Sequence, residues 1–278
     1  MMDASDLKAR LEEAAGALRG AIGDERPEVG LILGSGLGSF AECVEEPRIV
    51  SFHDVPHMPL STATSHKGRF VAGRVGGKRI IVMQGRVHGY EGYSAQEVAF
   101  PVWLMERLGV RTLIVTNAAG AINASYAPGE FCIMRDHINF TGRNPVAGLG
   151  NDTLASRFFS MKDAYDPELR ALARASARKL GISVQEGVYL GLLGPSFETP
   201  AEIEAFARWG ADSVAMSVVE EVIAARYVGM RVLGMSLISN MACGVEAANP
   251  SEDEVFEVAC RAEADFMRLM SDVVAALP

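Results

Sequence analysis

Cysteine is scarce in this sequence, and the few cysteines form no motif. The 278 residues contain four cysteines, and no two of them form a Cys-x-x-Cys pair. A chain of this length is no disulfide scaffold, so we expect free thiols in a reducing compartment. The five histidines also fail as a metal set: His53 and His57 are four residues apart, but Pro56 and Pro59 exclude a shared helix.

Positive charge is scarce as well. The chain has 26 Lys and Arg against 35 Asp and Glu, for a net charge of −9. This balance argues against nucleic acid and anionic membrane as partners. It leaves room for a small anionic substrate, provided that cations or backbone N–H groups are concentrated around it.

Long apolar runs are absent. No run reaches the roughly 18 residues that a membrane span requires, although the 49 % hydrophobic content suits a sizeable core. Residues 1–23 are charged and helix-like, and they lack the apolar region of a secretion signal. We therefore expect a cytoplasmic protein.

Segments with the apolar periodicity of a helix alternate along the chain with short apolar segments typical of strands. This alternation predicts an α/β fold. The predicted helices span residues 3–22, 94–109, 167–181, 200–210, 218–229 and 251–277. The predicted strands lie in residues 29–40, 69–85, 111–120, 130–139, 185–199, 211–217 and 231–242. Residues 69–85 form a hairpin around Gly76-Gly77. Ser94 and Glu97 form a capping box at the start of the second helix.

The chain shows no internal repeat and no low-complexity linker. We therefore expect one domain over residues 1–278. The longest irregular part runs from Thr141 to Tyr165 and is a candidate lid or subunit contact.

The segment Gly34–Gly38, "GSGLG", follows the first predicted strand. It departs from the dinucleotide fingerprint Gly-x-Gly-x-x-Gly, because Ser39 stands at the third glycine, and no Gly-Lys-Ser/Thr phosphate loop is present. The segment is either a tight turn or a cup of backbone N–H groups around phosphate, with Ser35 as a further donor.

A second glycine-rich segment, "QGRVHGYEGY", leaves the hairpin at residues 84–93. Arg86 offers a planar fork for phosphate oxygens, and His88 can donate a hydrogen bond to the same anion. The alternative is a surface hairpin with scattered polar residues. The flanking glycines favour a binding site, because they allow the backbone to approach a ligand closely.

Small or polar residues end three further strands. They are the segments "TNAAG" (116–120), "AMS" (215–217) and "SLISN" (236–240). Phe197 and Glu198 precede a predicted helix. Either Glu198 or Thr199 merely caps this helix, or the ring of Phe197 and the carboxylate of Glu198 recognise a flat heterocycle. Ligands of open α/β sheets bind beyond the carboxyl ends of the strands, so we expect one shared cleft.

Taken together, these segments resemble the trimeric purine nucleoside phosphorylases. The motifs "LGSGLG", "HKGR", "QGRVHGYEGY", "VTNAAG", "RDHIN", "GPSFET", "AMS" and "SLISN" occur in that family's order from about Val29 to the last helix. The resemblance implies a single α/β domain with a central mixed, partly barrel-like sheet flanked by helices. It also implies a homotrimer in purine salvage, with inorganic phosphate as co-substrate and neither metal nor other cofactor.

The resemblance assigns residues to each part of the substrates. For phosphate it implies Ser35, His66, Arg86, His88, the backbone of Ala118, and Ser217. For the nucleoside it implies Tyr90 and Met216 at the ribose; Phe197, Val214, Glu198 and Asn240 at the purine; and Phe158 in a neighbouring subunit's site. His88, Glu198 and Asn240 are the expected catalytic residues.

The implied reaction is the phosphorolysis of 6-oxopurine ribonucleosides or deoxyribonucleosides such as inosine and guanosine. Phosphate itself is the nucleophile, so the carboxylate pair of a glycosidase is not needed. Ionised Glu198 accepts a hydrogen bond from N1–H of a 6-oxopurine, whereas adenosine has no hydrogen at N1. Asn240 stabilises the negative charge on the leaving purine.

One departure from the family pattern bears on the substrate. Glu252 stands where the family usually has a histidine for the sugar 5′-hydroxyl. This difference gives some weight to a 5′-methylthioadenosine phosphorylase. A dinucleotide-dependent oxidoreductase built on "GSGLG" and a nucleoside-binding protein without catalytic activity are two further functions that the motifs leave open.

Overall fold

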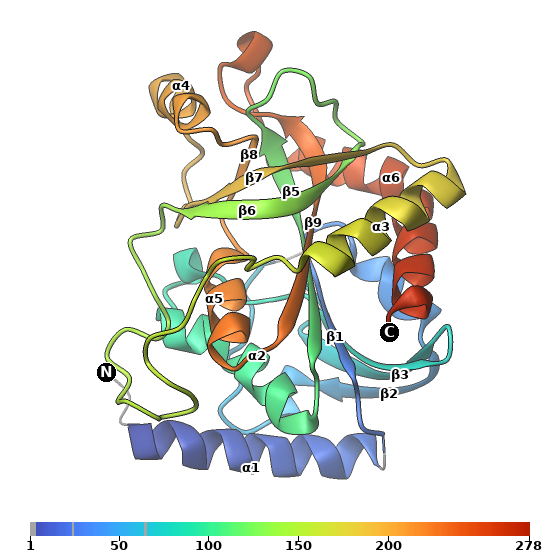
Figure 1. Ribbon diagram of the computed structural model, residues 1–278, viewed down its shortest axis with the longest axis vertical. Helices are drawn as coiled ribbons and strands as arrows, with labels where there is room; N and C mark the ends of the chain where they lie inside the picture. The colour runs from blue at the N-terminus through green and yellow to red at the C-terminus, as the bar shows by residue number, and fades with distance from the viewer. Residues whose placement is uncertain (1–3, 24, 64–65) are drawn as a thin grey trace.

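A mixed β-sheet forms the centre of the computed structural model, which describes residues 4–23, 25–63 and 66–278 (Figure 1). Its strands are β1 (Val29–Leu33), β2 (Glu45–Ser51), β3 (Arg69–Val75), β4 (Lys78–Gln84), β5 (Thr112–Ala121), β6 (Phe131–Asn139), β7 (Val184–Gly191), β8 (Ser213–Ala215) and β9 (Arg231–Met241). Their order in the sheet is β2-β3-β4-β1-β5-β8-β7-β6-β9.

The sheet closes on itself along part of its width. Strand β5 pairs with β8 on one side and in parallel with β9 on the other, so β5, β8, β7, β6 and β9 form a ring. Strands β1, β4, β3 and β2 extend the sheet beyond this ring as an open arm. The predicted α/β fold with a mixed, partly barrel-like sheet is confirmed.

Helices cover both faces of the open arm (Figure 1). The helices are α1 (Ala4–Ile22), α2 (Ala95–Leu108), α3 (Pro167–Leu180), α4 (Pro200–Arg208), α5 (Val219–Tyr227) and α6 (Glu252–Ala276). Helices α1, α2 and α5 share one apolar core, which includes Ile32 of β1, whereas α3 and α6 share a second core, which includes Leu31 and Leu33. This alternation along β1 follows from the two-residue period of a strand.

Local sequence signals account for several element ends. Strands β3 and β4 meet at Gly76-Gly77, and both glycines have positive φ. Ser94 accepts a hydrogen bond from the backbone N–H of Glu97, whose side chain accepts one from the N–H of Ser94, so the predicted capping box is confirmed. Strand β2 was not predicted, because it is mostly exposed, contains Pro47 and lies at the sheet edge.

The segment from Thr141 to Tyr165 contains neither helix nor strand, as predicted. Arg143 ties it to the rest of the chain: its Nε lies 2.8 Å from Oε1 of Glu220, and its Nη2 donates to the carbonyl of Tyr93 at 2.7 Å.

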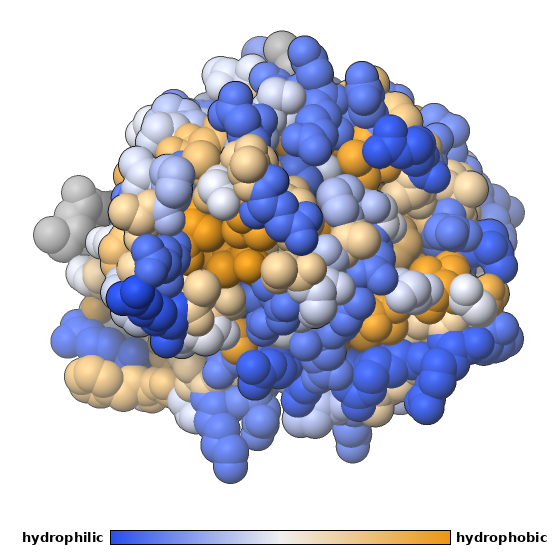
Figure 2. All heavy atoms as spheres, turned by 90° about the horizontal axis from the view of Figure 1, so that it is seen from above, coloured by the Kyte–Doolittle hydropathy of each residue, from blue (hydrophilic) through white to orange (hydrophobic). Residues whose placement is uncertain are grey.

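The face of the molecule seen from above is largely polar (Figure 2). On this face apolar side chains gather in one group left of the centre and in another toward the lower right, with polar side chains between and around them (Figure 2). Among the described residues, no helix combines the length and the apolar character of a bilayer span.

Candidate functional site

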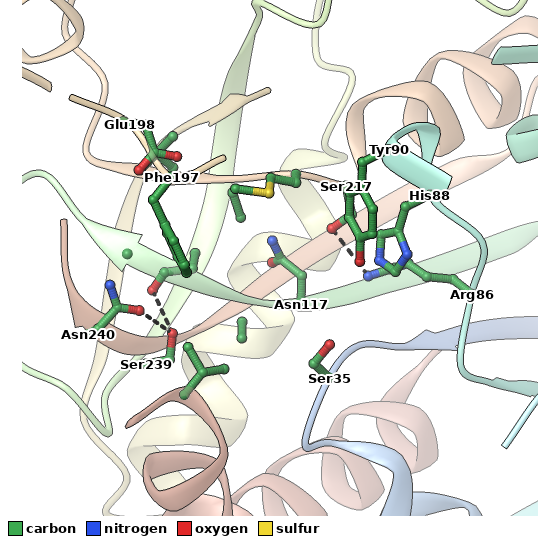
Figure 3. Close-up of a pocket in the computed structure, with 17 residues that line it drawn as sticks. Ser35, Arg86, His88, Tyr90, Asn117, Phe197, Glu198, Ser217, Ser239 and Asn240 are labelled. Atoms are coloured by element: carbon green, nitrogen blue, oxygen red, sulfur yellow. Dashed lines mark hydrogen bonds between the residues drawn. The ribbon is translucent and has the colours of Figure 1, made fainter. Parts of the chain in front are cut away.

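A cavity opens where several strands end, and residues from both glycine-rich segments line it (Figure 3). Its lining includes Ser35, Arg86, His88, Tyr90, Asn117, Ala118, Phe197, Glu198, Val214, Met216, Ser217, Ser239, Asn240 and Val255. The structure therefore brings together all but two of the residues predicted for phosphate and nucleoside. The two exceptions are His66 and Phe158.

The first glycine-rich segment is shaped by close contacts. A Cβ at Gly34 would lie 2.6 Å from the Cα of Asn117, and a Cβ at Gly36, where φ is +73°, would lie 2.2 Å from the Cβ of Ala259. The loop leads into a short 3₁₀ helix, Gly38–Cys43. No long helix begins at this turn, so it lacks the helix N-terminus on which a dinucleotide site depends.

Arg86 is buried at one end of the cavity, with 1 % of its surface exposed. Its Nε donates to Oε1 of Glu221 at 2.9 Å, and its Nη1 donates to the carbonyl of Thr116 at 2.6 Å. Its Nη2 is buried and has no partner among the described residues. Two of its three nitrogens thus hold the guanidinium in place, and the third is left for a ligand oxygen.

His88 is held by a carboxylate three residues further on. Its Nδ1 donates to Oε1 of Glu91 at 2.8 Å, and its backbone N–H donates to the same oxygen at 2.8 Å. Its ring lies in a stack between His66 and Tyr90, with centroid distances of 5.2 and 4.6 Å. Because Nδ1 is occupied by Glu91, Nε2 is the ring nitrogen that remains for a ligand.

His66 lies on the far side of His88 rather than in the cavity lining. Its Nδ1 donates to the carbonyl of Arg86 at 2.8 Å, while its Nε2 is buried without a partner among the described residues. Burial, followed by the charges of His88 and Arg86, lowers its pKa to about 4. It is therefore neutral at pH 7 and supports the ring of His88 without adding positive charge.

Ser217 is placed by a strained turn. Val218 has φ 73° and ψ −49°, and the N–H of Val219 donates to the carbonyl of Ser217 at 2.9 Å, which defines a γ-turn. The buried hydroxyl of Tyr189 also donates to that carbonyl at 2.9 Å. The turn sets the Ser217 hydroxyl 3.5 Å from Nη1 of Arg86 and begins helix α5, which carries Glu221.

The other end of the cavity holds a carboxylate, an amide and an aromatic ring. Glu198 is buried and Phe197 is half-exposed in the loop before α4. Asn240 lies on β9, where its Oδ1 accepts from the hydroxyl of Ser239 at 2.7 Å and its Nδ2 donates to the carbonyl of Met241 at 2.9 Å. Since Nδ2 carries two hydrogens, one remains for a ligand.

Phe158 lies away from this cavity. Its side chain is 86 % exposed, and it lines a separate hollow with His137 and Arg157. It therefore makes no contact with its own chain's cavity, and a role in a neighbouring subunit stays a prediction.

Among the residues that the sequence did not predict for the site, three bear directly on its polar groups. Glu91 fixes His88, Glu221 fixes Arg86, and Asn117 lines the cavity. Two signals were available: Glu91 stands three residues after His88, and Glu220-Glu221 interrupts an otherwise apolar helical segment. Among residues 4–23, 25–63 and 66–278, no group of three or more His, Cys, Asp and Glu side chains could hold a metal ion.

The Glu91 carboxylate is expected to stabilise the fold and to orient His88. Burial raises its pKa, but hydrogen bonds from His88 and Thr62 outweigh this effect and lower it to about 2. A lowered carboxyl pKa stabilises the folded state above the ordinary value of 4.5, and this stabilisation is lost as the pH falls toward about 2. We expect Glu91→Gln to lower the free energy of unfolding at neutral pH by about 2–3 kcal/mol.

Urea unfolding of both proteins at successively lower pH measures this effect. The difference in stability between wild type and Glu91→Gln should shrink as Glu91 becomes protonated. A difference that stays constant with pH contradicts the assignment. Glu97→Gln, which alters a carboxylate in the capping box of α2, is the matched control.

The fold is that of an α/β protein with a partly closed mixed sheet. One end of its cavity has a cation and hydroxyls, and the other end has a carboxylate, an amide and an aromatic ring. The chain belongs to the phosphorylase superfamily, whose family model matches residues 28–275. It is 46 % identical over 269 residues to purine nucleoside phosphorylase 1 of Bacillus subtilis (strain 168), and this alignment covers 97 % of this chain and 99 % of that protein. It is 40 % identical over 262 residues to the purine nucleoside phosphorylase of Bos taurus, and this alignment covers 92 % of this chain and 91 % of that protein.

Solved structures agree with this family. The purine nucleoside phosphorylase of Schistosoma mansoni in complex with inosine superposes with a TM-score of 0.92 at 34 % identity and covers 97 % of both chains. Isoform 2 from the same organism, in complex with cytosine and ribose-1-phosphate, superposes with a TM-score of 0.91 at 36 % identity over 97 % of both chains. The resemblance indicated by the motifs is confirmed at the level of the family.

Proposed function

We propose that the protein is a purine nucleoside phosphorylase that acts reversibly on 6-oxopurine ribonucleosides and deoxyribonucleosides. A phosphate oxygen forms a bond to C1′ of the sugar while the bond from C1′ to the purine breaks. The purine departs with the electron pair and takes up a proton. The products are the free base and ribose 1-phosphate or its deoxy analogue.

One observation carries this proposal: a single cavity has groups for an anion at one end and for a purine at the other (Figure 3). Nη2 of Arg86 and Nε2 of His88 are left for phosphate oxygens by the bonds that their other nitrogens make. Glu198 and Asn240 stand at the opposite end. The names of the relatives support the same activity.

The site needs no protein nucleophile for this reaction. As the glycosidic bond breaks, the sugar gains oxocarbenium character, and a phosphate fixed by Arg86 and His88 is both the stabilising anion and the nucleophile. The leaving purine gains negative charge, which the free Nδ2 hydrogen of Asn240 can stabilise. One such donor contributes about 3–4 kcal/mol to lowering the barrier.

A methylthioadenosine phosphorylase receives less support. The Bacillus and Bos relatives are both named purine nucleoside phosphorylases, which disfavours that function. Burial, together with the charges of Glu91 and, more weakly, of Glu252 at the start of α6, raises the pKa of Tyr90 to about 12. A homotrimer, a role in purine salvage and a cytoplasmic location stay predictions.

The absorbance change on base release from inosine and guanosine, with and without inorganic phosphate, tests the proposed function. We expect release that depends on phosphate and produces ribose 1-phosphate in equal amount. Binding without release would favour a nucleoside-binding protein without catalytic activity. A higher kcat/KM for 5′-methylthioadenosine than for inosine would contradict the proposed substrate class.

A further inference from the structure

Tyr189 is a fully buried residue whose hydroxyl is bonded to both main-chain groups of Ser217. It lies on β7 and belongs to the packing behind the cavity rather than to the lining. Its hydroxyl donates to the carbonyl of Ser217 at 2.9 Å and accepts from the backbone N–H of the same residue at 3.3 Å. A hydroxyl has one donor and two acceptor sites, so the two bonds can form together. Tyr189 therefore holds Ser217 by its main chain and leaves its side chain to other partners.

The turn that Tyr189 holds is strained. Val218, which follows Ser217, has φ 73° and ψ −49°, values close to those of the rarer and more strained of the two γ-turns. A β-branched side chain disfavours this backbone region. Such a conformation persists only where the surrounding groups fix it, and the hydroxyl of Tyr189 is one of those groups.

Strand β7 supports the same turn at a second point. Gly191 lies two residues after Tyr189 and therefore on the same face of the strand. A Cβ at Gly191 would lie 2.3 Å from Cγ2 of Val219, so the missing side chain lets Val219 pack against β7. One face of β7 thus fixes the first residue of the turn by hydrogen bonds and the last residue by packing.

The turn places two groups at the anion end of the cavity. The Ser217 oxygen lies 3.5 Å from Nη1 of Arg86 and accepts from it, so the hydroxyl hydrogen is left for a ligand oxygen (Figure 3). Helix α5 begins directly after the turn and carries Glu221, which accepts from Nε of Arg86 at 2.9 Å. A shift of the turn would therefore move the Ser217 hydroxyl and loosen the guanidinium at the same time.

We propose that Tyr189 is a positioning residue of the anion end, which acts through the main chain of Ser217 and keeps the strained turn formed before phosphate binds. This inference rests on the proposed function, which assigns that end of the cavity to phosphate. Donors that are already in place need no reorganisation on binding, so they improve both the affinity for the anion and its alignment as a nucleophile. Burial raises the pKa of Tyr189 above the ordinary value of 10, so its hydroxyl stays a donor at neutral pH.

Tyr189→Phe removes the hydroxyl and keeps the ring. We expect the KM for phosphate to rise about 10-fold, as for the loss of one or two hydrogen bonds, and the KM for inosine to stay nearly unchanged. Tyr165→Phe is the matched control, because Tyr165 is also fully buried but its hydroxyl lies 3.0 Å from Nδ1 of His137. The control should lose stability and keep the wild-type KM for phosphate. A purely structural role of Tyr189 would lower stability and kcat without raising the KM for phosphate.

A double-mutant cycle with Ser217→Ala shows whether Tyr189 acts through Ser217. Ser217→Ala removes the hydroxyl that the turn places. In that background Tyr189→Phe should raise the KM for phosphate much less than in the wild type, because the group that it positions is already absent. Equal rises in the two backgrounds would overturn the inference.

Gly191→Ala displaces the turn at its second support and tests the same arrangement if Tyr189→Phe does not fold. It should also raise the KM for phosphate. A wild-type KM for phosphate in either folded variant would overturn the inference and leave the proposed function intact.

Absence of phosphate-dependent base release by the wild type would overturn the proposed function instead. Calorimetric titration with inorganic phosphate then decides the inference without turnover. A Kd about 10-fold higher for Tyr189→Phe than for the wild type supports it. Equal affinities overturn it.

Discussion

Arg86→Ala is expected to lower kcat and raise the KM for phosphate strongly, and to destabilise the fold at the same time. Loss of a preorganised donor at a reacting anion lowers kcat by about 10²–10³-fold. The same change leaves Glu221, whose side chain is 3 % exposed, as a buried carboxylate without its cation. Breaking a buried ion pair in this way costs about 3–5 kcal/mol of stability.

A second variant separates these two effects. In the double variant Arg86→Met/Glu221→Leu both charges are replaced by apolar groups, so the unpaired carboxylate is gone and stability should recover. Activity should not recover, because no donor faces the phosphate. Phosphate titrations of initial rate and urea unfolding of each variant measure the two quantities.

Arg86→Lys is the matched variant that keeps the charge. One ammonium cannot replace a fork that contacts Glu221, Thr116 and a ligand with separate nitrogens, so we expect a large loss with this variant too. If folded Arg86→Ala keeps the wild-type rate and the wild-type KM for phosphate, the anion site has been placed wrongly.

Glu198→Gln is expected to abolish the preference for inosine over adenosine. The carboxylate accepts from N1–H of inosine, while adenosine presents a lone pair there. A site built for such a contact rejects the analogue that lacks it by about 10⁴-fold. A glutamine amide can donate to adenosine N1, so kcat/KM should fall for inosine and rise for adenosine.

The pH dependence gives a second measure of the same carboxylate. Burial is the largest influence on Glu198 and raises its pKa; its own backbone N–H lowers it and Glu202 raises it further. The carboxyl is protonated below this raised pKa and then no longer accepts from N1–H. The kcat/KM for inosine should therefore fall as the pH falls through this raised pKa, and Glu198→Gln should not show that step.

Glu204→Gln is the control for both experiments, since Glu204 lies on α4, the helix that follows the loop carrying Glu198, and its side chain is 67 % exposed. It should behave as wild type. Comparable kcat/KM values for adenosine and inosine in the wild-type protein would contradict the assignment of Glu198.

The sequence was most informative where structure depends on neighbours in the chain. Capping by Ser94 and Glu97 and the turn at Gly76-Gly77 are set within a few residues, and both were predicted. Strand β2 was not, because an exposed edge strand with a proline has no alternation of apolar residues. The closure of β5 onto β9 has no local signal either and entered through the resemblance.

The candidate site shows the same division. The motifs named most of the residues that line the cavity, because each motif ends a strand and strand ends converge. They gave no information on Glu221 as the partner of Arg86, which is 135 positions away, or on Ser236 as the partner of Asn117, which is 119 positions away.

The amino-acid sequence by itself determined the order of the helices and of every strand except β2, the family, and the kinds of side chain available to an anion and a purine. The tertiary structure alone decided which donors are already used and which remain for a ligand. The reason is physical: whether a buried donor is satisfied depends on the groups packed around it, and in this protein those groups come from distant strands and helices.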